Sequence, residues 1–188
     1  MLKVLGGAFA AMCEVADGVR PADLVRPTPC GEYDVRRLLE HLIGWQQVFA
    51  ACAVDEQPPL ADGSPTYVLT GEPGPEVRSA STALAATLDG RAAETITLPY
   101  RGTVPVANLI DELIAETVIH TWDLAAGLGR SVEFDPAIIA VAQVGLTRML
   151  AESFAEQGFR RADGATAGDE LGDLLVRSGR DPLWSAPG

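Results

Sequence analysis

The stretch Leu109–Arg130, LIDELIAETVIHTWDLAAGLGR, constrains the fold of this chain more than any other part of the sequence. Its apolar residues recur at steps of three and four, which is the spacing of one side of an α-helix. Glu116, His120 and Asp123 fall on that same side, among the leucines. Because a buried carboxylate is costly unless it is paired, these polar residues need a partner in the core. The sequence therefore predicts a long, largely buried helix that carries a polar site.

A divalent metal ion is the partner that these residue types favour. Glu116 and His120 are one helical turn apart, so their side chains can converge, and neutral imidazole is a common metal ligand. His41, the only other histidine, shares one side of a second predicted helix with Leu38 and Trp45. Two helices can bring three ligands together in a bundle core, and three protein ligands leave an open position. Zinc is the default ion for such a set, with nickel, iron, cobalt and manganese left open.

Other interpretations of these side chains stay open. An isolated ExxxH pair is often solvated, and a core histidine can bond to the backbone instead. Asp123, one turn beyond His120, is a candidate to hydrogen-bond a ligand histidine or to be a solvated acid. Trp45 is a candidate for the wall of a substrate pocket or for the core. Arg101 and Arg148 are candidates to bind a substrate carboxylate, or ordinary surface residues.

The remaining periodicity predicts an all-α chain in one domain, residues 1–188. The simplest architecture is an up-and-down four-helix bundle with a small β-hairpin and an extra C-terminal helix. Short β-prone segments lie at 95–98 and 103–106, and long loops are expected at 55–75 and 158–169. The predicted helices cover residues 2–18, 34–54, 76–88, 106–127, a segment opening at 135–136, and 171–176.

Composition excludes several classes of partner. The net charge is −12, and basic residues cluster no further than Arg36–Arg37 and Arg160–Arg161, so nucleic acid and anionic membranes are poor partners. No apolar run approaches the roughly 20 residues that a membrane helix needs. The three cysteines are far apart and form no CxxC motif, which is typical of a reduced cytoplasmic protein.

The N-terminal segment, residues 2–18, carries a long apolar stripe. Glu14 and Asp17 follow its apolar part at once, which favours an amphipathic first helix over a signal peptide. The stripe is also one reason to expect a homodimer.

Two blocks of the chain, Thr28–Gly44 (TPCGEYDVRRLLEHLIG) and Glu116–Arg130 (ETVIHTWDLAAGLGR), carry a family resemblance. They resemble the metal-binding domain of mycothiol-dependent maleylpyruvate isomerases, a member of the DinB-like helical bundle superfamily. The resemblance is closer to an actinobacterial subgroup of uncharacterised proteins of about this length. The closing block Leu174–Pro182, LLVRSGRDP, is similar to the C-terminal end of that subgroup. Tyr33 stands where the family often has tryptophan.

The resemblance implies a ligand set and a chemistry. By motif position the family's histidine, glutamate and histidine ligands fall on His41, Glu116 and His120. A metal at an open site stabilises a thiolate, so the implied activity uses a low-molecular-weight thiol, mycothiol, against a small electrophilic substrate by transfer or isomerisation. DinB-like proteins are often dimers, which also favours a homodimer. The 188 residues leave no length for the second domain of those isomerases, so a different substrate is expected. Two alternatives are a non-catalytic metal-binding bundle, acting as a sensor or small-molecule binding module, and a metal-free interaction domain.

Overall fold

The computed structural model describes residues 2–152 and 168–186, which are mostly helical with two small antiparallel hairpins. The hairpins pair β1 (Leu60–Ala61) with β2 (Ser64–Pro65), and β3 (Thr95–Leu98) with β4 (Gly102–Pro105). A 3-10 turn, η1 (Pro21–Asp23), follows the first helix. The α-helices are α1 (Leu2–Asp17), α2 (Val35–Ala53), α3 (Pro73–Leu88), α4 (Val106–Gly127), α5 (Pro136–Leu150) and α6 (Glu170–Arg177).

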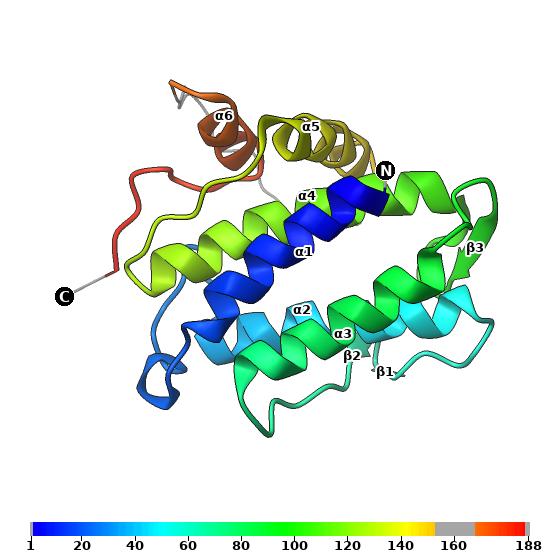
Figure 1. Ribbon diagram of the computed structural model, residues 1–188, viewed down its shortest axis with the longest axis horizontal. Helices are drawn as coiled ribbons and strands as arrows, with labels where there is room; N and C mark the ends of the chain where they lie inside the picture. Colours follow the sequence, from blue (N-terminus) through cyan, green and yellow to red (C-terminus); the bar gives the residue numbers. More distant parts are fainter. Residues whose placement is uncertain (1, 153–167, 187–188) are drawn as a thin grey trace.

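Four of these helices surround one apolar core. Helix α1 packs on α3 and α4, and α2 packs on the same two helices from the other side. Figure 1 shows α1 and α3 in front of α4 and α2, with α5 and α6 stacked outside α4. The β3–β4 hairpin lies against α2 and the start of α4. The predicted helical class with a small hairpin is therefore confirmed, while the up-and-down bundle stays a prediction.

The helix boundaries follow from capping and from proline placement. Asp34 and Asp135 cap α2 and α5 at the helix starts that the sequence predicts, and each side chain accepts a backbone N–H bond from the first turn. Helix α3 begins three residues earlier than expected, at Pro73, because proline fits the first turn of a helix, where its missing N–H is not needed.

The segment expected to be one long loop, residues 55–75, is more structured than predicted. It contains the β1–β2 hairpin, and its last residues form the start of α3. It also packs closely on α2, since a Cβ added to Gly44 would lie 2.5 Å from the Cβ of Pro65. The backbone N–H of Leu69 donates to Glu40 at 3.1 Å. Short polar contacts of this kind are not visible in a sequence rich in proline and glycine.

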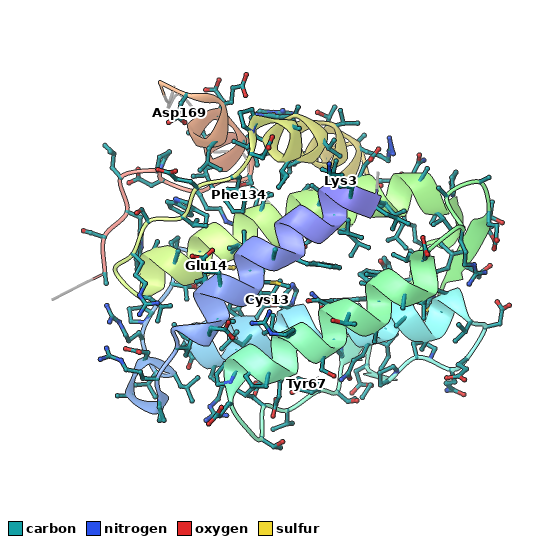
Figure 2. All side chains as sticks on the ribbon, in the orientation of Figure 1. Lys3, Cys13, Glu14, Tyr67, Phe134 and Asp169 are labelled. Atoms are coloured by element: carbon teal, nitrogen blue, oxygen red, sulfur yellow. The ribbon has the colours of Figure 1, made fainter. Side chains whose placement is uncertain are left out.

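The apolar stripe of α1 is buried inside the chain. It packs against α3 and α4, and Cys13 on the same helix points toward α3 (Figure 2). The stripe is therefore used within one molecule and no longer argues for a homodimer, which stays a prediction of the family resemblance. The buried stripe residues include Leu5, Ala8, Phe9, Met12 and Val15.

Among the described residues, no helix is both long and apolar enough to span a bilayer.

Helices α5 and α6 form an outer layer on α4. Gly145 lets α5 approach α4 very closely, because a Cβ added there would lie 2.0 Å from the carbonyl oxygen of Asp111. Helix α6 buries Leu174 and Leu175, which confirms the predicted closing helix. Most of the loop predicted at 158–169 lies outside the described residues.

Candidate metal centre

Helix α4 carries three polar residues on one side, as its sequence predicts. Glu116, His120 and Asp123 are spaced by four and three residues, so they lie one above another along the helix. Their exposure decreases along this row: the side chains are 33%, 5% and 0% exposed. Because α4 packs against α1, α2 and α5, only the Glu116 end of the row reaches solvent.

Helix α2 brings His41 to the same place. The N-terminus of α2 is fixed by its Asp34 cap and by the preceding loop, in which the Thr28 hydroxyl donates to the carbonyl of Tyr33 at 2.7 Å. The Tyr33 phenol oxygen then lies 3.3 Å from Nδ1 of His41. Tyr33 was noted in the sequence only as a motif residue, and the structure places it directly on a candidate ligand.

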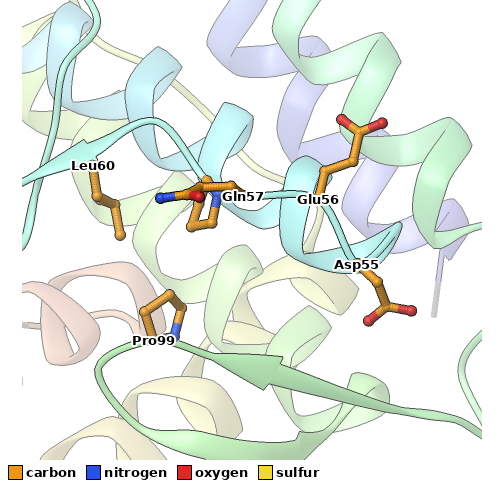
Figure 3. A pocket seen from close by; sticks show the side chains of 6 residues that line it. Asp55, Glu56, Gln57, Leu60 and Pro99 are labelled. Atoms are coloured by element: carbon orange, nitrogen blue, oxygen red, sulfur yellow. The ribbon is translucent and has the colours of Figure 1, made fainter.

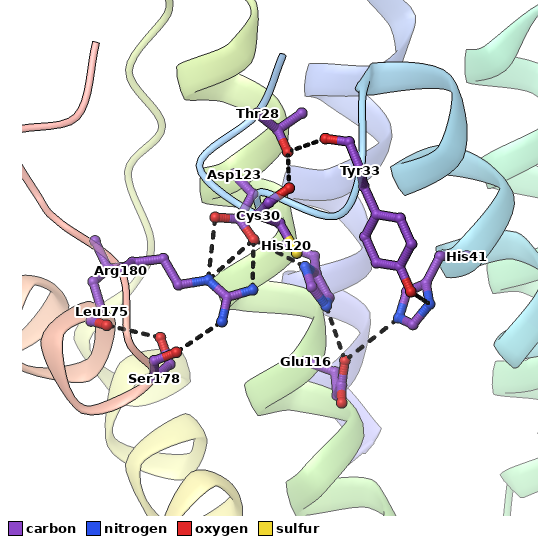
Figure 4. A network of polar contacts seen from close by, with 10 residues as sticks. All are labelled: Thr28, Cys30, Tyr33, His41, Glu116, His120, Asp123, Leu175, Ser178 and Arg180. Carbon is purple, nitrogen blue, oxygen red and sulfur yellow. Dashed lines mark hydrogen bonds and ion pairs between the residues drawn. The ribbon is translucent and has the colours of Figure 1, made fainter. Parts of the chain in front are cut away.

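Both imidazoles turn the same atom toward Glu116 (Figure 4). Nε2 of His120 lies 3.2 Å and Nε2 of His41 lies 4.0 Å from Oε2 of Glu116. The Nδ1 atom of each ring is hydrogen-bonded on its outer side, to Asp123 at 2.9 Å and to Tyr33 respectively. Ligand atoms about 2.0–2.2 Å from a tetrahedral ion are roughly 3.3 Å from one another. The two nitrogens and the oxygen lie within 4.8 Å of one another, so this group could hold a single divalent ion.

The ionisation of this cluster reflects competition between burial and pairing. Burial acts to raise the pKa of Glu116, but hydrogen bonds from His120 and His41 outweigh it and hold that pKa below its usual range. Burial also lowers the pKa of His41, against the opposing bond to Glu116. For His120, burial is outweighed by hydrogen bonds to Asp123 and Glu116, and the pKa rises above 6.5. The two histidines therefore differ in how readily they hold a proton.

A second group of possible ligands shares His120. Cys30, His120 and Asp123 have ligand atoms within 4.8 Å of one another. The carboxylate of Asp123 is already bonded by Nδ1 of His120 and by the guanidinium of Arg180. Burial raises the pKa of the Cys30 thiol to about 11, which keeps it protonated at neutral pH. The group around Glu116 is therefore the better candidate for a metal.

An aromatic strip continues from the candidate ligands toward the β3–β4 hairpin. The Trp45 ring lies edge-on to His41, with centroids 6.4 Å apart, and stacks on Phe49. Tyr100, in the β3–β4 turn, contacts Trp45 edge-on at 5.3 Å and is 42% exposed. Burial, together with the nearby Glu116 carboxylate, raises the pKa of Tyr100, so its phenol keeps its proton. Trp45 is partly buried and packs against the core, and its role as the wall of a substrate pocket stays a prediction.

The two candidate arginines for a substrate carboxylate are held by acids. Arg101 makes hydrogen-bonded ion pairs with Glu112 and Glu152. Arg148 lies 3.6 Å from Asp111 and 3.9 Å from Glu112. A substrate carboxylate would have to compete with these acids for either arginine.

A shallow hollow lies along the same end of the molecule (Figure 3). It runs between the segment after α2 and the β3–β4 turn, and it is open to solvent. None of its lining residues is a candidate ligand. The site is therefore located by its converging donor atoms and not by this hollow, whose lining is Asp55, Glu56, Gln57, Pro58, Leu60 and Pro99.

Sequence reasoning gave Arg180 no role, yet it lies at the back of the site. Its Nη2 donates to Asp123 at 3.0 Å, and both side chains are almost fully buried. The signal that could have found it is charge balance: a buried acid on α4 needs a cation, and Arg180 stands in the closing block of the chain.

Comparison with known proteins places the chain in a family. Residues 5–125 match the model of the mycothiol maleylpyruvate isomerase N-terminal domain. Two proteins of Mycobacterium tuberculosis, both described as uncharacterized, are each 32% identical over 146 residues, which cover 76% of this chain and 73% of theirs. They come from strains CDC 1551 / Oshkosh and ATCC 25618 / H37Rv. No solved structure gives a significant match. The family match spans the α2 and α4 residues that form the cluster, and the chain therefore belongs to the mycothiol maleylpyruvate isomerase N-terminal domain family.

Proposed function

We propose that this chain is a metal-dependent enzyme of its family that uses a low-molecular-weight thiol, with mycothiol as the first candidate, to attack a small electrophile. In this proposal His41, Glu116 and His120 hold one divalent ion, with zinc as the default. The proposal rests on the orientation of the two imidazoles. Their Nε2 atoms both face one carboxylate oxygen of Glu116, while their Nδ1 atoms contact Tyr33 and Asp123. We also propose that residues 1–188 form a single cytoplasmic domain with the DinB-like bundle architecture.

The donor set fits such an ion. A metal held by three protein ligands, with one position open, supplies Lewis-acid stabilisation that lowers the pKa of a bound thiol. The chain's own residues fix the donors. Asp123 accepts from Nδ1 of His120, which leaves the lone pair on Nε2, and this pairing is the usual support of a metal-ligating histidine. Tyr33 provides the matching contact for Nδ1 of His41.

The surroundings of the ligands suggest the kind of substrate. Tyr100, which is near Glu116, and Trp45, which Tyr100 contacts edge-on, offer an apolar aromatic surface suited to an uncharged organic group. Arg101 and Arg148 already have acidic partners, so within the described residues they are poor candidates for holding a carboxylate. We therefore propose a neutral electrophile in preference to a dianionic one.

Binding of a thiol should be visible in the cobalt-loaded protein. Saturating mycothiol should add a near-ultraviolet charge-transfer band, because the thiolate is the bound form, and thiol binding should release a proton into weakly buffered solution. Absorption spectroscopy and a pH indicator measure the two effects. Glutathione tests whether the sugar part of mycothiol adds affinity.

The matched control is the His120→Ala variant, which should give neither signal. An unchanged cobalt spectrum under saturating mycothiol would contradict the thiol chemistry. If metal still binds in that case, the chain is better described as a non-catalytic metal-binding module.

Metal affinity should fall as the pH is lowered, and His120 should set where the fall begins. Its pKa is raised above 6.5 in the metal-free protein, so a proton competes with the metal at a higher pH than for an ordinary histidine. His41 has a lowered pKa and competes only at lower pH. Below the pKa of His120, affinity should drop about tenfold per pH unit. Competition with a chromophoric chelator between about pH 5.5 and 8.5 measures this, and a flat profile would contradict the assignment.

A further inference from the structure

Arg180 is the charge partner of the buried acid behind His120. Asp123 has a side chain that is 0% exposed, and such a carboxylate needs a close cation. Nη2 of Arg180 donates to Oδ2 of Asp123 at 3.0 Å, and Nε lies 3.3 Å from both carboxylate oxygens. The same Oδ2 accepts from Nδ1 of His120 at 2.9 Å. Figure 4 shows the three groups in a row that ends at Glu116.

The end of α6 holds Arg180 in this position. Gly179, in the left-handed region at φ 85°, reverses the chain after the helix, and the backbone N–H of Arg180 donates to the carbonyl of Leu175 at 2.8 Å. Nη1 of the guanidinium donates to the carbonyl of Ser178 at 2.8 Å. With acceptors on two sides, the Ser178 carbonyl and the Asp123 carboxylate, the guanidinium is held in one orientation and so orients that carboxylate.

From this geometry we propose that Arg180 is a positioning residue of the candidate metal centre, acting through Asp123 on the orientation of His120. The inference rests on the proposed metal site and adds to it a residue beyond 5–125, the part of the chain that matches the family model. Without Arg180, the carboxylate would lose its three guanidinium contacts and be free to rotate away from Nδ1. His120 would then no longer be held with Nε2 toward Glu116.

The consequence is that the C-terminal segment belongs functionally to the site. Helix α6 packs on α5, and the turn that follows α6 places Arg180 against Asp123. Metal affinity should therefore respond to a change at Arg180 even though this residue offers no ligand atom to the ion.

The test compares Arg180→Gln with Arg177→Gln. Arg177 is the last residue of α6, three residues before Arg180, and it donates hydrogen bonds to Gln143 and Thr147 on α5 instead of to Asp123. We expect Arg180→Gln to weaken zinc binding about 10–100-fold in chelator competition, the range for losing the hydrogen-bond partner of a ligand histidine, because the variant releases Asp123 from its position. Arg177→Gln should bind zinc like the wild-type chain, and Arg180→Lys, which keeps the charge, should recover part of the loss.

Two further measurements keep the proposal falsifiable. Because Arg180→Gln leaves a buried carboxylate without its cation and can fail to fold, the double variant Asp123→Asn with Arg180→Gln removes both charges and should fold with the same loss of affinity. Nitrogen-15 NMR of the metal-free protein at about pH 8 should show a proton on Nδ1 of His120 in the wild type, and a population that lacks this proton in Arg180→Gln.

The outcomes separate the two proposals. Wild-type zinc affinity in both the single and the double variant would overturn the role of Arg180 and leave the metal site intact. A wild-type chain that binds neither zinc nor cobalt would overturn both proposals. Weakened binding in the Arg180 variants, with normal binding in Arg177→Gln, supports the positioning role.

Discussion

Replacing His120 with alanine should abolish stoichiometric metal binding while leaving the helical fold in place. His120 supplies the donor nearest to Glu116, with Nε2 3.2 Å from Oε2, so its loss leaves only one nitrogen and one carboxylate. The loss of affinity should exceed the roughly 10–100-fold expected for groups that only hydrogen-bond a ligand. Elemental analysis of protein purified without a histidine tag measures it, and circular dichroism follows the fold.

The fold should survive because apolar contacts hold it. The core around α4 consists of fully buried aliphatic residues that do not depend on the metal, unlike the core of a zinc finger. Cys30→Ala is the matched control, since Cys30 lies within 4.8 Å of His120 in the other ligand group and should not be needed. Retention of stoichiometric metal by all three alanine variants, at His41, Glu116 and His120, would exclude this site.

A second large effect is expected at Gly145, where alanine should destabilise the protein by about 2–4 kcal/mol. The added Cβ would lie 2.0 Å from the carbonyl oxygen of Asp111 and 2.5 Å from its carbonyl carbon. These are backbone atoms of α4, so the clash can be relieved only if α5 moves away from α4 as a whole. Urea unfolding followed by circular dichroism measures the change.

Gly6→Ala is the matched control and should change the free energy of unfolding in the opposite direction. Gly6 also lies in a helix, α1, but a Cβ there meets no atom within 4 Å. Removing a helical glycine at an open position should stabilise by about 0.5–1 kcal/mol. Equal effects at the two positions would show that α4 and α5 do not approach as closely as described.

The sequence by itself determined the elements and one half of the site. Apolar periodicity places α4 at its observed bounds, and capping acids place the starts of α2 and α5. These features depend on neighbours three or four residues apart, which a sequence displays directly. The same local rule puts Glu116, His120 and Asp123 on one side of a helix, and the two family motifs added His41 to the set.

Only the tertiary structure decided which groups complete that set. Tyr33, just before α2, reaches His41 within that helix, and Arg180 reaches Asp123 over 57 residues of sequence; neither contact follows from helical spacing. The tertiary structure also pairs Arg101 and Arg148 with acidic residues on α4, which makes both arginines less available to a substrate. The physical reason is that a charge is satisfied by whatever opposite charge the packing brings near, and that packing depends on the whole core. Local periodicity determined where the candidate ligands lie on their helices, and the packing of α2, α4 and α6 determined which residues hold them in place.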